Sequence, residues 1–193
     1  MSFLTITHTR YNTLTAVEQR YEGFMSSNTT DQAAERPTQQ ITVTVNGEEV
    51  TAEVEPRLKL SDFLRYNEGL RSVRVGCEHG VCGACTVDID GAIGKSCMLY
   101  AVQVDGGEVT TVEGLDDSGS LHPLQQAFHE EHALQCGFCT SGFVMAARDL
   151  LESNPDPDRS EIRTGLSDNI CRCTGYSNIL DAVELAADEM EDD

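Results

Sequence analysis

The eight cysteines of this 193-residue chain fall into two groups of four, and each group could bind metal. One group lies in a short glycine-rich run and the other is divided between two later pairs. In chain order they are Cys77, Cys82, Cys85 and Cys97, then Cys136, Cys139, Cys171 and Cys173. Thiolates are ligands that soft transition metals prefer, and four of them complete one centre. The sequence therefore predicts two metal centres.

The first group has the spacing C-x4-C-x2-C-x11-C, and its first three positions match the loop of plant-type 2Fe-2S proteins. Gly76, Gly80 and Gly83 lie among these cysteines. A loop that wraps closely around sulfur needs backbone angles open mainly to glycine, and it must turn amide N–H groups inward. We therefore expect an irregular loop whose amides stabilise a negatively charged cluster.

The second group combines C-x2-C with C-x-C, and 31 residues separate the two pairs. The stretches QCGFCTSG and ICRCTGY both run from cysteines into a threonine and small residues, and each precedes a predicted helix. The positive end of a helix dipole favours thiolates, and its exposed N–H groups can bond to sulfur. Two such helix ends facing each other would form a four-sulfur cage.

Other interpretations of the cysteines stay open. Structural zinc and disulfides also use cysteine pairs, although the x4 step and the x11 closure favour a larger binuclear iron cluster. A Rieske centre needs two histidine ligands, and His79 is the one histidine in the first loop. We interpret His79 as a solvated loop residue, and His122, His129 and His132 as surface or packing residues.

Motifs for substrate chemistry are missing from the sequence. It has no glycine-rich dinucleotide motif after a strand, no phosphate-binding loop, and no convincing pair of nucleophile and base. We therefore expect neither a flavin site nor catalysis on this chain.

Residues 41–115 carry the pattern of a small mixed sheet crossed by a helix. Alternating apolar residues flank Asn46-Gly47, the strongest two-residue hairpin signal, and place Val43 opposite Val50. A short helix is expected to follow, and further strands extend from the cysteine loop to the sequence EVTTVEGL.

The boundaries of that short helix come from its end signals. Ser61 is the expected N-cap, and Gly69 is the expected end.

Residues 116–193 carry helical periodicity after a linker at DDSGS. Pro123 begins one helix, a second ends at Asn154-Pro155, a shorter one includes Ile162, and the last reaches Met190. Four amphipathic helices bury their apolar faces against one another, so we expect a small bundle.

Residues 1–40 are polar and lack a sustained apolar period. We interpret them as a mobile extension or as an arm that binds a partner. The start of the chain has no signal-peptide pattern, and no apolar run approaches the length of a membrane span. We therefore expect a cytoplasmic protein with reduced thiols.

The charge of the chain is strongly acidic. It has 13 basic and 33 acidic residues, for a net charge of −20, and such a surface repels nucleic acids and anionic membranes as partners. Only two of the basic residues are lysines, Lys59 and Lys95. Dispersed acidity with little lysine predicts a halophilic, salt-adapted source, and an ordinary acidic protein is the alternative.

Six stretches resemble, in order, the small iron-sulfur subunit of the molybdenum hydroxylases. This family includes xanthine dehydrogenase, aerobic carbon monoxide dehydrogenase and aldehyde oxidoreductases. The stretches are GCEHGVCGACTVDIDG, SCMLYA, VTTVEGL, LHPLQQAF, QCGFCTSGFVMAA and LLESNPDPDRSEIRTGLSDNICRCTGYSNILDAV. The resemblance covers residues 41–190.

The resemblance implies an α+β chain, in which a β-grasp, ferredoxin-like 2Fe-2S domain precedes a four-helix 2Fe-2S domain. It implies that Cys136, Cys139, Cys171 and Cys173 receive electrons from molybdopterin in a large subunit. Cys77, Cys82, Cys85 and Cys97 would pass them to FAD in a medium subunit.

By the same resemblance, Gln135 contacts the pterin, and Cys173 is the ligand nearest to it. Ser141-Gly142 and Asp168 depart from the Pro-Gly and Gly of many relatives. The alternative function is a free-standing two-cluster carrier, which would be monomeric and charged on every face.

Overall fold

The structure is a computed structural model that describes residues 36–115 and 119–191. Most of the polar extension expected at residues 1–40 therefore lies outside the described residues. Its last two residues already belong to the first strand, which begins at Gln39. Residues 37–193 form one compact unit.

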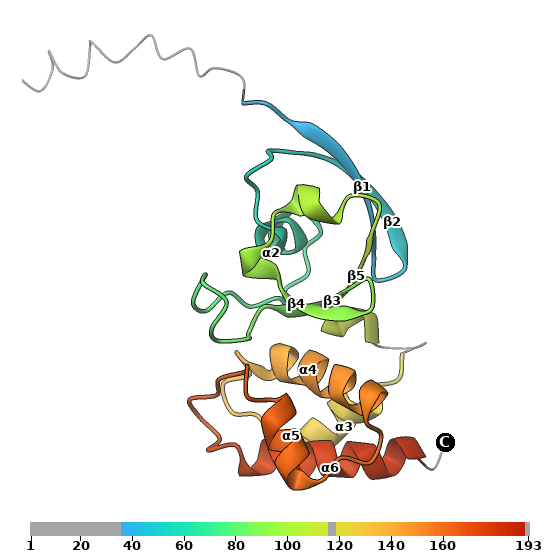
Figure 1. Cartoon of the computed structure of the whole chain (residues 1–193), viewed down its shortest axis with the longest axis vertical. Coiled ribbons are helices and arrows are strands. Elements are labelled where there is room, and N and C mark those ends of the chain that lie inside the picture. The colour runs from blue at the N-terminus through green and yellow to red at the C-terminus, as the bar shows by residue number, and fades with distance from the viewer. Residues whose placement is uncertain (1–35, 116–118, 192–193) are drawn as a thin grey trace, which may run out of the picture. The chain divides into compact units, whose positions relative to one another are not determined.

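A five-stranded mixed sheet occupies one end of this unit (Figure 1). Its strand order is β2-β1-β5-β3-β4, with β1 and β5 parallel and the other neighbours antiparallel. The strands are β1 (Gln39–Val45), β2 (Glu48–Val54), β3 (Thr86–Ile89), β4 (Ala92–Lys95) and β5 (Glu108–Thr110). The predicted hairpin is confirmed, since Val43 pairs with Val50 across the Asn46-Gly47 turn.

Short helical segments lie around the sheet, and all of them except η4 contribute side chains to its core (Figure 1). They are α2 (Leu60–Asp62), the π-type turn η1 (Phe63–Asn67), and the 3-10 segments η2 (Ser96–Met98), η3 (Ala101–Val104) and η4 (Val112–Leu115). Leu60, Phe63 and Leu64 are fully buried against the strands.

The expected N-cap of that helix was wrong. The helix begins at Leu60 after Lys59, and Ser61 is buried within it. Burial of the Leu60 side chain fixes this start, because it outweighs the roughly 1 kcal/mol that a serine cap contributes. Gly69 follows the turn with φ +76°, which agrees with its expected role as the end.

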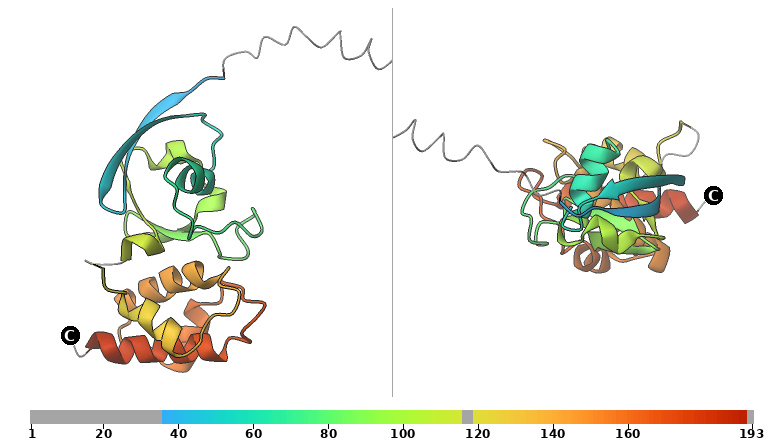
Figure 2. Two further views of the ribbon diagram at one scale, coloured as in Figure 1. Left: turned by 180° about the vertical axis from the view of Figure 1, so that it is seen from behind. Right: turned by 90° about the horizontal axis from the view of Figure 1, so that it is seen from above.

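The four predicted helices form the second half. They are α3 (Pro123–Glu130), α4 (Thr140–Ser153), α5 (Arg159–Gly165) and α6 (Ser177–Glu191). Their apolar faces share one buried cluster that is separate from the core of the sheet. Figures 1 and 2 show α4 between the sheet and the other helices, and α4 contacts β3 and β4.

The two halves approach each other closely at Gly142, in the first turn of α4. A Cβ atom at this position would overlap the carbonyl oxygen of Gly83, and it would lie 3.0 Å from Asn169 Nδ2. Gly83 itself has φ +72°, and a Cβ atom there would lie 2.6 Å from Asn169 Cγ. Only a residue without a side chain lets these backbones approach so closely.

We predict that Gly142→Ala destabilises the chain by about 1–3 kcal/mol, because the new methyl group meets rigid backbone. Gly165→Ala is the matched control, since a Cβ atom there meets only the flexible side chain of Leu150, at 3.0 Å. Urea unfolding followed by circular dichroism measures both variants. Equal midpoints for the two variants would contradict the steric argument.

Candidate metal centres

The first four cysteines surround one end of the sheet. Cys77 and Cys82 lie in the irregular loop before β3 and are partly exposed, whereas Cys85 and Cys97 are each 2% exposed. The thiols of Cys77 and Cys82 lie within hydrogen-bonding reach of each other, and so do those of Cys85 and Cys97. The loop thus holds an outer and an inner pair of sulfurs.

Backbone amides of this loop point at the sulfurs, as the sequence predicted. N–H groups of His79, Cys82 and Val81 bond to the Cys77 thiol, and they lower its pKa to about 6. Burial and the neighbouring Cys85 raise the pKa of Cys97 to about 11. Cys77 is therefore pre-organised to carry negative charge, and Cys97 needs a cation close by to do so.

The expected use of glycine in this loop is confirmed in part. Gly80 and Gly83 have positive φ angles, +80° and +72°. Gly76 does not, but a Cβ atom there would lie 3.1 Å from Cys82 Sγ. Gly76 therefore serves close packing on sulfur and not an unusual backbone angle.

A carboxylate anchors the start of the loop. Glu113 of η4 accepts hydrogen bonds from the amide of Ser72 (2.8 Å), from the Ser72 hydroxyl, and from Thr111 Oγ1 (2.7 Å). Burial opposes the charge, but these bonds outweigh it and lower the pKa of Glu113. Ser141 Oγ donates to the Ser72 carbonyl at 2.6 Å, which links this anchor to α4.

The second four cysteines lie at one end of the helices. Cys139 directly precedes α4, and Cys171 and Cys173 lie in the loop between α5 and α6. Cys136 Sγ and Cys173 Sγ are 3.6 Å apart, and Cys139 and Cys171 are within hydrogen-bonding reach. The pairs therefore form across the two segments, with Cys136 and Cys173 exposed.

One expectation for this group was wrong. Only the C-x2-C pair adjoins a helix start, since α6 begins at Ser177, four residues after Cys173. Thr174 takes the place of helix amides: its Oγ1 and its N–H donate to Cys171 Sγ at 3.2 and 3.4 Å. Burial opposes this effect, but the bonds lower the pKa of Cys171, while burial and Cys171 raise that of Cys139 to about 12.

Both groups fit a binuclear iron-sulfur cluster. Two thiolates on one tetrahedral metal at about 2.3 Å lie about 3.8 Å apart, close to the Cys136–Cys173 separation of 3.6 Å. Within the described ranges, no three His, Cys, Asp or Glu side chains converge as ligands of a single ion. A 2Fe-2S cluster does not require three, since each iron takes two protein ligands. None of the eight cysteines forms a disulfide.

The four histidines in the described ranges do not act as ligands in either group. His79, His129 and His132 are exposed. His122 caps α3, because its Nδ1 accepts the amide of Leu124 at 3.2 Å. Its role is structural, as expected.

Backbone hydrogen bonds join the two cysteine loops directly. The amide of Ile170 donates to the carbonyl of Cys82 at 3.0 Å. Asn169 Nδ2 donates to the carbonyl of Gly83 at 3.2 Å, although Asn169 Oδ1 is buried without a partner among the described residues. Ile170 directly precedes Cys171. A single hydrogen bond therefore connects the backbone beside a cysteine of the second group to the backbone of a cysteine of the first group.

Gln135 lies beside the exposed sulfurs of the second group. Its side chain is exposed, and its Nε2 donates to the carbonyl of Cys173 at 3.2 Å. The structure therefore brings Gln135, to which the resemblance gives a pterin contact, next to Cys173, which the resemblance makes the cluster ligand nearest to the pterin.

Two families of domains match this chain. Residues 43–110 match the family described as 2Fe-2S iron-sulfur cluster binding domain, and residues 111–184 match the family described as 2Fe-2S binding domain.

Within the part of the chain that the structure describes, none of the helices is both long and apolar enough to span a bilayer.

Relatives are similar over most of the described residues. The nicotine 6-hydroxylase small subunit of Paenarthrobacter nicotinovorans is 54% identical over 75% of this chain and 87% of its own length. Caffeine dehydrogenase subunit gamma of Pseudomonas sp. (strain CBB1) is 48% identical over 78% and 92%. A chain in the crystal structure of quinoline 2-oxidoreductase from Pseudomonas putida 86 superposes with a TM-score of 0.78 and 46% identity, covering 80% of this chain and 97% of that one.

We predict that Glu113→Gln weakens folding by about 1–2 kcal/mol at pH 7, because charge-assisted hydrogen bonds to Ser72 are lost. The pKa of Glu113 is lowered by folding, so its stabilisation is complete above the ordinary value of 4.5 and is lost as the pH falls through the folded pKa. The difference from wild type should therefore shrink below pH 4.5.

Urea unfolding at pH 7, 5.5 and 4 measures this difference. Glu48→Gln, at an exposed position of β2, is the control and should leave stability unchanged at all three values. A Glu113→Gln difference that stays constant with pH would refute the anchoring role of the carboxylate.

Proposed function

Because the chain belongs to the small iron-sulfur subunits of the molybdenum hydroxylases, we propose that it carries electrons from molybdopterin in a large subunit, through two 2Fe-2S clusters, to FAD in a medium subunit. The clusters supply one-electron redox chemistry. The residues of this chain hold them, donate hydrogen bonds to sulfur and bury their inner edges. Several relatives carry subunit names, which favours a permanent subunit over a free-standing carrier.

We propose that all eight cysteines are ligands. In the first cluster Cys77 and Cys82 hold the outer iron, and Cys85 and Cys97 hold the inner one. In the second cluster Cys136 and Cys173 hold the exposed iron, and Cys139 and Cys171 hold the buried one. The contacts between the thiols of each pair support this assignment.

The observation that carries the relay is the hydrogen bond from the Ile170 amide to the Cys82 carbonyl, because it places the two cysteine loops side by side. It joins the buried side of the second cluster to the first cluster. The exposed side of the second cluster, with Cys173 and Gln135, is left to face the molybdopterin subunit. The first cluster then faces the flavin subunit.

The relatives differ in the substrates that their names give. Subunits of nicotine, caffeine and nicotinate enzymes are 43–54% identical to this chain, and aldehyde oxidoreductase proteins are 41–45% identical. Comparable identity across such different molecules supports the view that this chain provides the shared electron-transfer step. The large subunit then selects the substrate.

We propose that the chain has three segments: an extension at residues 1–40, a first cluster domain at 41–115 and a second cluster domain at 116–193. The side chains of Val112 and Leu115 in η4 pack on the helical core, and the second family match begins at residue 111. These findings support a division near residue 115, with η4 as the connection between the two domains.

We also propose a cytoplasmic, salt-adapted setting for the complex. Eight free cysteines favour a reducing compartment. A net charge of −20 with two lysines favours concentrated salt, where screening weakens self-repulsion.

The order of the clusters can be tested by removing one at a time. We predict that Cys85→Ser and Cys139→Ser each reduce the iron content of the chain from about four to about two. In the whole complex, reduction by substrate should still reach the second cluster in Cys85→Ser, but not the flavin. In Cys139→Ser it should reach neither the first cluster nor the flavin.

Electron paramagnetic resonance of the clusters and absorbance of the flavin measure these outcomes. Flavin reduction at the wild-type rate in both variants would refute the relay. Stoichiometric zinc with no iron in the wild-type chain would refute the clusters themselves.

We predict that Thr174→Val lowers the reduction potential of the second cluster, because a hydroxyl bond to Cys171 Sγ stabilises the more negative reduced form. A hydrogen bond of about 1 kcal/mol corresponds to a shift of about 40 mV for one electron. Thr174→Ser keeps the hydroxyl and should stay near wild type. A redox titration followed by electron paramagnetic resonance measures the potential of the second cluster in each variant. Equal potentials for Thr174→Val and Thr174→Ser would contradict the proposed role of the Thr174 hydroxyl.

A further inference from the structure

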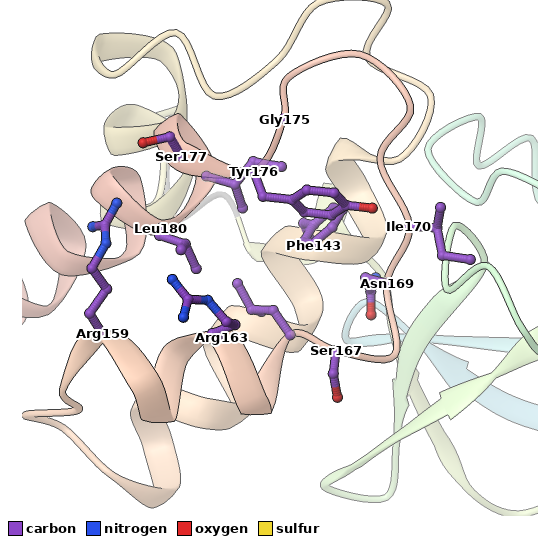
Figure 3. A pocket seen from close by; sticks show the side chains of 12 residues that line it. Phe143, Arg159, Arg163, Ser167, Asn169, Ile170, Gly175, Tyr176, Ser177 and Leu180 are labelled. Carbon is purple, nitrogen blue, oxygen red and sulfur yellow. The ribbon is translucent and has the colours of Figure 1, made fainter.

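A pocket of about 530 Å³ opens between α5 and the start of α6 (Figure 3). One wall belongs to the loop that carries Cys171 and Cys173, through Ile170, Gly175 and Tyr176. The pocket therefore lies next to the loop that carries the second cysteine pair, through residues on both sides of Cys171 and Cys173.

The pocket is basic in a strongly acidic chain. Two arginines of α5 line it and no carboxylate does, although the net charge of the chain is −20. Figure 3 shows Arg159 and Arg163 extending from α5 toward the first turn of α6, which contains no acidic residue. An anionic group is favoured at such a position.

The two arginines differ in how their charges are compensated. Arg159 forms ion pairs with Asp181 (2.8 Å) and Glu184 (2.6 Å) on α6. Arg163 is exposed and forms no ion pair with any residue in the described ranges. Arg163 therefore has its guanidinium available for an external carboxylate.

Apolar side chains complete the pocket. Phe143 is buried at its base and meets the Tyr176 ring edge-on, with ring centroids 6.3 Å apart. Ile170 and Tyr176 remain 47% and 39% exposed at the rim. The occupant should thus combine an acidic group with an apolar one.

We propose that this pocket receives an acidic segment of the large molybdenum subunit, whose carboxylate binds Arg163 and whose apolar side chain packs against Ile170 and Tyr176. The inference rests on the proposed function. Gly175 and Tyr176 follow Cys173 within three residues, so a subunit that approaches Cys173 to deliver electrons comes close to this part of the rim. On so acidic a surface, an unpaired arginine fixes where a partner's carboxylate can dock.

Binding of the cluster-loaded full chain to the purified large subunit tests this proposal by biolayer interferometry. Arg163→Gln should weaken binding at least about tenfold, because one half of a desolvated charge pair is removed. Arg163→Lys should bind with an affinity between those of wild type and Arg163→Gln, since lysine keeps the charge without the bidentate geometry. Arg71→Gln, at an exposed position in the first domain, is the matched control and should bind as wild type.

The spectra of both clusters and the unfolding midpoint should be unchanged in Arg163→Gln, which separates docking from folding. Wild-type affinity in Arg163→Gln, or equal weakening in Arg71→Gln, would overturn the inference and leave the proposed function intact. Failure of the wild-type chain to bind the large subunit would overturn both. Benzoate binding that Arg163→Gln abolishes, with subunit affinity unchanged, would assign the pocket to a small aromatic acid instead.

Discussion

The carbonyl group of Gly83 is the point on which the arrangement of both cysteine groups depends. It accepts hydrogen bonds from Thr86 N (3.1 Å), Thr86 Oγ1 (2.7 Å) and Asn169 Nδ2 (3.2 Å). Gly142 lies against it and has no side chain that would push α4 away. Because Gly83 lies between two cysteines of the first group and Asn169 lies two residues before Cys171, this one contact fixes the spacing of both groups. Asn169 Oδ1 is buried and has no partner among residues 36–115 and 119–191, and this is a cost of that geometry, since an unsatisfied carbonyl typically costs about 1–3 kcal/mol.

This contact also explains why, within each group, the sulfurs differ in their exposure to solvent. The inner sulfurs of both groups lie against packed protein, so burial raises the pKa values of Cys97 and Cys139. The outer sulfurs lie at the surface, where loop amides lower the pKa values of Cys77 and Cys136. The second group departs from this pattern, because the hydrogen bond with Cys136 raises the pKa of the outer Cys173, and burial of the inner Cys171 is outweighed by bonds from Thr174 that lower its pKa. Each group thus has a buried edge and an open edge. Two partners can therefore approach from different sides without displacing either cysteine loop.

Local signals in the sequence predicted most of the elements, and long-range contacts account for what it missed. The hairpin at Asn46-Gly47 follows from two residues, whereas the hydrogen bonds between Asn46 and Thr111 join positions 65 apart and leave no local signal. Ser61 is not the N-cap, because packing of Leu60 into the core, and not the local capping signal, determines where that helix starts. The roles of Asn169 and Gly142 depend on a backbone that approaches from another domain, and only an assembled structure can show it. Cysteine spacing is an exception, because metal ligation restricts it independently of the distant fold.

Charge and apolar exposure are distributed in a complementary way over the chain. Most of the 33 acidic residues lie after residue 40, yet the loops around the sulfurs expose apolar side chains such as Val81 (55%), Met98 (50%) and Phe138 (45%). Lone apolar residues on a surface need no explanation, but these lie beside the open edges of the cysteine groups. A strongly acidic remainder keeps such a chain from associating with itself through those edges, because like charges repel wherever two copies approach. Partners that cover the edges must then bring apolar surface together with few acidic groups of their own. Where they do bring a carboxylate, it has to meet an unpaired arginine.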